Sequence, residues 1–397
     1  MNLHLPLGFR FAGVSAGIKR NSAKEDLTLV HCPNGATAAG VYTTNLVYAA
    51  PVAVDRARTP SADIRIVIVN SGNANACTGE RGLRDANEMA RLAAAAVGAK
   101  ENQALVMSTG VIGNFLPMDK IAAGVTAARA KLATDEAAFL AAARGILTTD
   151  KGMKIGSRSL SLGGTTIRLA GMCKGAGMIG PQMATMLCVV ATDAALMPSG
   201  AQAALKYAVE GSFNCISVEG HMSTNDTVLL LASGAADSKP LGGKELSQFE
   251  AALCELCVEL AKQIADDGEG ASHLITVEIH GAKTHEEARR IAQTVANSAL
   301  VKTAISGGDP NWGRIVSAVG YAGVPLDPAG IDLSINGFPL YERGAPVAFD
   351  AKTVSASIKS NRETSVVITL REGAANIRFW TSDLNVEYVR FNADYTT

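Results

Sequence analysis

Residues 174–187 read KGAGMIGPQMATML, in which a glycine-rich turn leads to Ala184, Thr185 and an apolar run. The run continues through residues 186–190 and predicts a strand that begins at a hydroxyl residue. Glycine allows strained backbone geometry, and strain of this kind is often stored where chemistry happens. Cleavage before Thr185 would free an α-amino group beside its hydroxyl, which is one established way to activate a threonine nucleophile. The stretch therefore predicts a strand that directly follows a self-cleaved peptide bond.

Three glycines of the same stretch, Gly175, Gly177 and Gly180, also form the pattern G-x-G-x-x-G of dinucleotide-binding proteins. That pattern requires a strand before it and a helix that opens within it. Residues 166–170 (TIRLA) predict the strand, but residues 187–191 (LCVVA) predict a second strand too soon for the helix. An NAD-binding oxidoreductase is therefore the weaker alternative. A plain turn between two core strands, as in a protein without catalysis, is the third interpretation.

Further motifs accompany this stretch along the chain. They are GFRFAGVSAGIK (8–19), VNSGNANACTG (69–79), STGVIG (108–113), ILTTD (146–150), STND (223–226), AKQIADDGEGA (261–271), LVKTAISGGDPNWGRI (300–315) and FNADYTT (391–397). In this order they closely resemble the ornithine acetyltransferases, also called glutamate N-acetyltransferases, of arginine biosynthesis. Because the likeness runs nearly from end to end, it is far more specific than any single motif.

The resemblance implies an α+β fold, a layered αββα sandwich of the ornithine acetyltransferase/aminopeptidase superfamily with a smaller α/β region. It also implies self-cleavage between Ala184 and Thr185. Residues 1–184 would form an α chain, and residues 185–397 a β chain that begins with the nucleophile Thr185. The sequence shows neither internal repeats nor low-complexity linkers, so we expect both chains to share one core. With the resemblance goes the further expectation of a dimer of such heterodimers.

The implied reaction is acetyl transfer from N2-acetyl-L-ornithine to L-glutamate through an acetyl-threonine intermediate on Thr185. The free α-amine of an N-terminal residue has a reference pKa near 7.7–8.0, so it can act as the general base. The resemblance assigns the oxyanion hole to Thr109 and Gly110, where a Thr-Gly turn can direct a hydroxyl and an N–H at one point. Whether acetyl-CoA is a second acetyl donor is left open by the sequence.

Substrate recognition is assigned by the same resemblance to Thr148, Lys174, Thr185, Glu269, Asn392 and Thr397. Lys174 suits the α-carboxylate of the substrate, whereas Glu269 and the terminal carboxylate of Thr397 suit the side-chain ammonium. Thr149 is easily confused with Thr148, because both precede Asp150. One departure is visible: Glu219-Gly220-His221-Met222 stands before STND where family members often carry an Asp-x-Asp pair.

Composition narrows the class of partner. Lysines and arginines number 36 and aspartates and glutamates 37, so no net field favours nucleic acid or an anionic membrane. No apolar run has membrane-spanning length, and the N-terminus has no targeting pattern, so a cytoplasmic location is expected. The seven cysteines do not suggest a disulfide framework, and Cys254 and Cys257 are expected on the apolar face of a helix. Neither a metal nor a cofactor is predicted.

Hydrophobic periodicity predicts elements along the whole chain. Helices are expected at 82–97, 118–132, 135–145, 199–210, 246–266 and 286–298. Strands are expected at 64–69, 166–170, 186–190, 227–232, 275–279, 365–370 and 377–380, with a turn at 70–75.

Overall fold

The structure is a computed structural model that describes residues 3–19, 23–180, 186–237 and 239–394. Three of the residues assigned from the sequence, Ala184, Thr185 and Thr397, lie outside the described residues. The helices are α1 Ala50–Arg58, α2 Gly79–Ala96, α3 Met118–Ala130, α4 Glu136–Gly145, α5 Pro198–Glu210, α6 Gly243–Asp266, α7 His285–Asn297, α8 Ala299–Gly307, α9 Trp312–Gly320, α10 Ala351–Ser360 and α11 Val386–Asp394. The strands are β1 Arg10–Val14, β2 Leu27–Tyr42, β3 Ser61–Asn73, β4 Ala104–Val111, β5 Lys154–Leu162, β6 Thr165–Lys174, β7 Leu187–Thr192, β8 Ile216–Ser217, β9 Thr227–Ala232, β10 Leu274–Ala282, β11 Asp332–Ile335, β12 Phe338–Glu342, β13 Ala345–Pro346, β14 Glu363–Thr369 and β15 Ala375–Ser382.

The first sheet is mixed, with the strand order β4-β3-β2-β9-β7-β6-β5 and β1 paired to β2. The long strand β2 connects its two halves. The first part of β2 pairs with β3, and its last six residues, from Thr37 to Tyr42, pair with β9. The register between β2 and β3 shifts twice between His31 and Ala38, and such irregularities bend a strand. The bend allows one half of the sheet to lie over the other.

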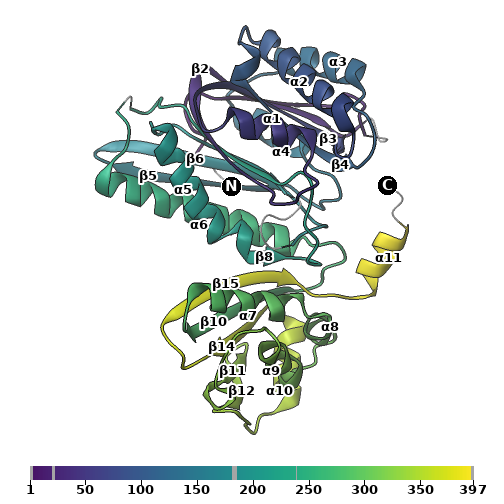
Figure 1. Ribbon diagram of the computed structural model, residues 1–397, viewed down its shortest axis with the longest axis vertical. Helices are drawn as coiled ribbons and strands as arrows, with labels where there is room; N and C mark the ends of the chain where they lie inside the picture. The colour runs from purple at the N-terminus through teal and green to yellow at the C-terminus, as the bar shows by residue number, and fades with distance from the viewer. Residues whose placement is uncertain (1–2, 20–22, 181–185, 238, 395–397) are drawn as a thin grey trace.

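Alternating side chains build the layers. In β3, Val67 and Val69 face a core that they share with Leu187 and Val189 of β7. The intervening residues Ile66 and Ile68 of β3 pack instead with residues of α2 and α3. On the other half, Cys188 and Val190 of β7 pack with residues of α5 and α6. The period of two in a strand thus gives the order helix, sheet, sheet, helix, and the expected αββα layering is confirmed (Figure 1).

The second sheet forms the smaller α/β region, with the order β13-β12-β11-β14-β10-β15-β8. It is also mixed, because β10 pairs parallel to β14 and antiparallel to β15. Helix α7 packs on β10 and β15. One hydrophobic core contains residues of both regions, such as Leu256 of α6 and Ile275 of β10. The second sheet therefore packs against the sandwich through a shared hydrophobic core.

The strands on either side of residue 185 are interleaved. Strands β7 and β9 come from the second half of the sequence, yet they lie between β2 and β6 of the first half. Pairing between β6 and β7 extends from Lys174 opposite Leu187 to Leu169 opposite Thr192. The parts of the chain before and after residue 185 therefore contribute strands to one sheet.

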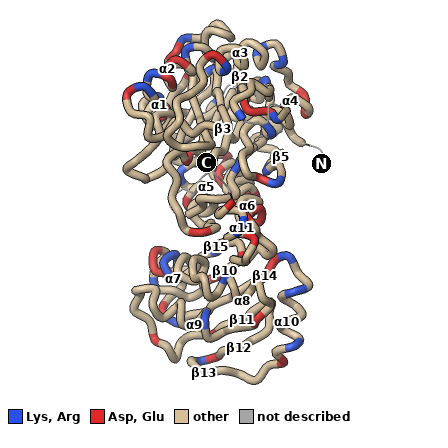
Figure 2. Tube along the Cα trace, turned by 90° about the vertical axis from the view of Figure 1, so that its right-hand side faces the viewer, with Lys and Arg blue, Asp and Glu red and all other residues tan. Residues whose placement is uncertain are grey.

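Every helix and strand expected from periodicity is present, with end points that differ by a few residues. Asp135 lies just outside its helix as the N-cap, where its carboxylate accepts the Ala138 N–H at 2.9 Å. The turn expected at 70–75 was placed too early, because β3 continues to Asn73. Among the described residues no helix is long and apolar enough to cross a membrane. Lysine and arginine positions are interspersed with aspartate and glutamate positions along the Cα trace, as Figure 2 shows.

Candidate active site

Several predicted residues lie where strands of the first sheet end. Lys174 is the last residue of β6, and it pairs with Leu187, the first residue of β7. Leu187 pairs on its other side with Thr227, the first residue of β9. The residue that follows Thr185, Met186, therefore lies between the ends of β6 and β9. Met186 therefore marks the end of the sheet at which the predicted site residue Lys174 lies.

Thr109 and Gly110, the predicted oxyanion hole, lie near the end of β4. Thr109 is buried, and both residues line a small cavity of about 50 Å³. Gly110 has a φ of +134°, and a Cβ on it would lie 2.3 Å from the carbonyl carbon of Gly72. Only glycine fits there, because the backbone of β3 would collide with any side chain. The position thus demands glycine for a physical reason.

The side chain of Asn225 joins this cavity to the STND loop. Its amide donates to the carbonyl of Ser108 at 2.8 Å and to the carbonyl of Ala74 at 2.6 Å. The loop residues Ser223, Thr224 and Asn225 line the same cavity as Thr109. Asn225 precedes Asp226, whose carboxylate accepts the Met186 N–H at 3.1 Å. One loop therefore connects the predicted oxyanion hole to the start of β7.

Lys174 belongs to a buried group of charges. The carboxylate of Asp150 accepts hydrogen bonds from the Lys154 ammonium at 2.6 Å and from the Gly175 N–H at 2.7 Å. The Lys154 ammonium also donates a hydrogen bond to the carboxylate of Asp267 at 2.6 Å. Burial raises the pKa of Asp150, but the ammonium groups of Lys174 and Lys154 outweigh it and hold that pKa well below its usual range. Burial lowers the pKa of Lys174, and the carboxylate of Asp150 partly opposes this. Lys174 is therefore a fully buried amine beside the carboxylate of Asp150.

Glu269 is brought to the same region by the end of α6. Its carboxylate accepts the Thr149 hydroxyl at 2.7 Å and the Asn392 amide at 3.1 Å. Its backbone N–H donates to the carbonyl of Ala176 at 2.8 Å. Of the two adjacent threonines, the one that contacts Glu269 is Thr149, whereas Thr148 donates its N–H to Asp150 at 2.9 Å. The hydrogen bond from Asn392 thus connects α11 to the carboxylate of Glu269.

The departure noted at Glu219 concerns this region. Burial raises the pKa of Glu219 to about 8, and the Lys302 ammonium acts in the opposite sense. Burial also raises the pKa of Tyr388 on α11, and the carboxylates of Glu219 and Glu269 raise it further. Glu219 thus contributes a second acidic side chain near Glu269.

Within the described residues the glycine pattern lacks the helix that a dinucleotide site requires. Strand β6 precedes the pattern, but residues 176–178 form bends, and the next described element is β7, which runs antiparallel to β6. A Cβ on Gly177 would lie 2.4 Å from the carboxyl carbon of Glu269, and one on Gly180 would lie 2.7 Å from the Gly220 carbonyl carbon. Close packing therefore explains two of the glycines.

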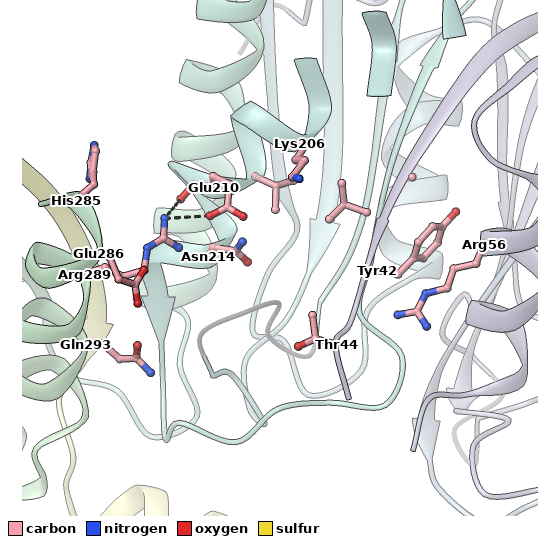
Figure 3. A pocket seen from close by; sticks show the side chains of 13 residues that line it. Tyr42, Thr44, Arg56, Lys206, Glu210, Asn214, His285, Glu286, Arg289 and Gln293 are labelled. Atoms are coloured by element: carbon pink, nitrogen blue, oxygen red, sulfur yellow. Dashed lines mark hydrogen bonds and ion pairs between the residues drawn. The ribbon is translucent and has the colours of Figure 1, made fainter. Parts of the chain in front are cut away.

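A wider cavity of about 650 Å³ lies between the end of β2, α5 and α7 (Figure 3). Two of its charged side chains form an ion pair, Arg289 with Glu210 at 3.0 Å, and a third, Arg56, donates to the carbonyl of Thr43. At its rim the Thr44 hydroxyl meets the Met222 sulfur at 3.5 Å. None of the residues assigned from the sequence lines this cavity within the described part of the chain.

The two cysteines of the C-x-x-C pair lie in α6, where Cys257 is buried in the core and Cys254 is partly exposed.

Three polar residues of the candidate site were not assigned from the sequence. Asp150, Asn225 and Asp226 each lie within a quoted motif, ILTTD or STND, but their partners come from distant parts of the chain. Only the motifs themselves could have drawn attention to them.

Comparison with known proteins gives the family. The ArgJ family model matches residues 10–397. The arginine biosynthesis bifunctional protein ArgJ of Rhodopirellula baltica is 49% identical over 396 residues, 99% of this chain and 96% of that protein. The protein of the same name from Symbiobacterium thermophilum is 47% identical over 397 residues, 99% of this chain and 98% of that protein. A crystal structure of ArgJ from Bacillus halodurans is 39% identical, with a TM-score of 0.50, and covers 51% of this chain and 96% of the solved chain. The chain therefore belongs to the ArgJ family of arginine-biosynthesis proteins.

Proposed function

We propose that this chain is an ornithine acetyltransferase that transfers the acetyl group of N2-acetyl-L-ornithine to L-glutamate through Thr185. The observation that carries the proposal is the arrangement around Met186. This residue directly follows Thr185, lies between Lys174 and Asp226, and is connected through Asn225 to the cavity of Thr109 and Gly110. Family membership supports the same reaction.

The chemistry requires two acyl-transfer steps. In the first, the Thr185 hydroxyl attacks the acetyl carbonyl carbon while the free α-amine of Thr185 takes the hydroxyl proton. The Thr109 hydroxyl and the Gly110 N–H would stabilise the oxyanion, and ornithine leaves with its α-amine protonated by the same base. In the second step, the α-amine of glutamate attacks the acetyl-threonine ester and regenerates the Thr185 hydroxyl.

Recognition follows from the charges of the site. Lys174 is buried, so a substrate carboxylate would be bound in a poorly solvated place where an ion pair is strong. Glu269, held by Thr149 and Asn392, is suited to the side-chain ammonium of ornithine. Thr148 and the terminal carboxylate of Thr397 complete the proposed set of binding residues.

Self-cleavage between Ala184 and Thr185 is part of the proposal, because an internal threonine has no free α-amine. The solved Bacillus halodurans chain supports it: that chain is covered to 96% by about half of this one, so it is about half as long. The products, residues 1–184 and 185–397, would stay together through the shared sheet and form a dimer of heterodimers. The cytoplasmic location expected from the sequence belongs to this proposal as well.

Two measurements test the proposal. A denaturing gel with N-terminal sequencing should give two chains, the second beginning at Thr185, and Thr185→Ala should stay intact. The purified enzyme should move a labelled acetyl group from N2-acetylornithine to glutamate, with ping-pong kinetics. A full-length band from active enzyme, or a Thr185→Ala chain that still divides, would contradict it. The same assay with acetyl-CoA as donor decides the second activity, which the name of the bifunctional relatives suggests.

A further inference from the structure

Both backbone groups of Met186 are held by neighbouring residues of one loop and strand. The N–H of Met186 donates to the carboxylate of Asp226 at 3.1 Å. The carbonyl of Met186 accepts the N–H of Thr227 at 3.1 Å. Met186 itself is buried. Two hydrogen bonds therefore hold the backbone at the first residue after Thr185. One of them, the bond of the Met186 N–H, is made to a side chain and not to the backbone of a neighbouring strand.

Asp226 is itself held firmly. Its side chain is fully buried, and its backbone carbonyl accepts the Thr43 N–H at 2.9 Å. The preceding residue, Asn225, is anchored to Ser108 at the end of β4. The carboxylate of Asp226 thus connects Met186 to the strand that carries Thr109. Such an anchor has few ways to move, which is what a group that sets the position of a nucleophile requires.

We propose that Asp226 is a positioning residue for Thr185, which it orients by accepting the hydrogen bond of the Met186 N–H. This inference rests on the proposed role of Thr185 as nucleophile. The Met186 N–H belongs to the planar peptide unit that begins at residue 185, so a bond to that N–H restrains the orientation of residue 185. In this role Asp226 acts through Met186, the described residue whose N–H it accepts.

The role requires an acceptor oxygen and does not require a negative charge. Burial raises the pKa of Asp226 well above its ordinary value, and the charged group that opposes this is the Lys174 ammonium.

Substitutions at Asp226 separate the acceptor from the charge. Asp226→Asn keeps an acceptor oxygen in a neutral side chain of the same shape, whereas Asp226→Leu has a similar size and no acceptor. Displacing a reacting group by about 1 Å can cost about 10²-fold in rate. We therefore expect Asp226→Leu to slow self-cleavage at least about tenfold and to lower kcat by a similar factor with KM little changed. Asp226→Asn should restore both rates to within about threefold of the unmodified chain.

Asp193 provides a matched control at the opposite end of β7. It is also fully buried, it accepts the N–H groups of Arg168 and Leu7 at 2.7 and 3.1 Å, and it forms an ion pair with the Arg168 guanidinium at 3.1 Å. Asp193→Leu should lower the melting temperature at least as much as Asp226→Leu, because it removes this ion pair as well as the acceptor of backbone N–H groups. In its folded fraction, however, self-cleavage should continue at the unmodified rate.

The experiment is a time course of cell-free translation, with denaturing gels for cleavage and steady-state kinetics on the purified variants. Normal cleavage and normal kcat in folded Asp226→Leu would overturn the proposal. So would an Asp226→Asn chain that cleaves tenfold more slowly than the unmodified chain, and this result decides the matter even if the leucine variant does not fold. Thr185→Ala, run in parallel, tests the nucleophile itself: its cleavage would refute the proposed function without addressing Asp226.

Discussion

Replacing Thr109 with alanine is the sharpest test of the predicted oxyanion hole. Thr109 is 3% exposed and lines the small cavity beside Gly110. Its side chain makes no hydrogen bond with another described residue, so the substitution breaks none among them. The neighbouring Ser108 remains anchored by its hydroxyl, which donates to Asn70 at 2.6 Å. We therefore expect folding to be weakened by only about 1 kcal/mol, as for an ordinary substitution.

The catalytic effect should be larger than the effect on stability. One donor of an oxyanion hole contributes about 3–4 kcal/mol in the transition state, which corresponds to a loss of about 10²–10³ in kcat. Since the hydroxyl would act only on the oxyanion, KM for both substrates should change little. Self-cleavage also passes through an oxyanion, so the Thr109→Ala precursor should divide slowly if the two reactions share the hole.

Steady-state kinetics of acetyl transfer, measured beside thermal melting, decide this prediction. Thr109→Ser retains the hydroxyl donor and serves as the control. Its kcat should stay within about tenfold of that of the unmodified enzyme, because the loss of about 10²–10³ is expected only when the donor is removed. A Thr109→Ala enzyme with normal kcat would remove Thr109 from the oxyanion hole. A tenfold rise in KM at unchanged kcat would assign the hydroxyl to substrate binding instead.

Three further predictions concern the charged side chains. Lys174→Ala should raise KM for acetylornithine and for glutamate alike, by about tenfold or more, because both carry an α-carboxylate; an unchanged KM for either substrate contradicts the assignment. Glu269→Gln should weaken acetylornithine much more than glutamate, because glutamate has no side-chain ammonium, and equal losses would refute its role. For Glu219, the folded pKa of about 8 lies above the ordinary 4.5, so the folded state holds a proton that the unfolded state loses. Stability should therefore fall as pH rises from 4.5 to 8, and Glu219→Gln should abolish much of that fall; identical pH profiles of melting would show that the carboxyl group is solvated.

The local sequence pattern was sufficient where an element has one buried face or is buried along its whole length. Helix α7 alternates charged and apolar residues at helical spacing, and β9 is an uninterrupted apolar run, so both were predicted. Strand β2 was not, because residues 33–37 (PNGAT) read as a turn, and only its two sheet partners hold it extended. Helices α8 and α9 were missed because Gly307, Gly308 and Pro310 divide them into short pieces. Tertiary pairing overrides local preference in such segments.

The site was predictable only in part for a related reason. Motifs and resemblance identified Lys174, Glu269 and Gly110, each within a recognisable segment. The partners that hold these groups come from distant positions: Thr149 meets Glu269 across 120 residues, and Asn225 meets Ser108 across 117. No local pattern encodes such pairings. The two adjacent threonines are equivalent in sequence, yet in the fold the hydroxyl of Thr149 donates to Glu269 and the backbone N–H of Thr148 donates to Asp150.

The position of the proposed cut explains how cleavage can create a nucleophile without dividing the protein. Separation of the two chains would require β7 and β9 to leave the middle of the first sheet. It would expose Leu187, Val189, Leu229 and Leu231, all at most 3% exposed, and each such side chain contributes about 1.5–3 kcal/mol by its burial. It would also break the ladders of β6 with β7 and of β2 with β9. The cleaved chains should therefore separate only when the protein unfolds, so size-exclusion chromatography without denaturant should show one species. Because Lys174 ends β6 in the first chain and Met186 precedes β7 in the second, the same ladder that joins the chains also keeps the proposed carboxylate site beside the new N-terminus.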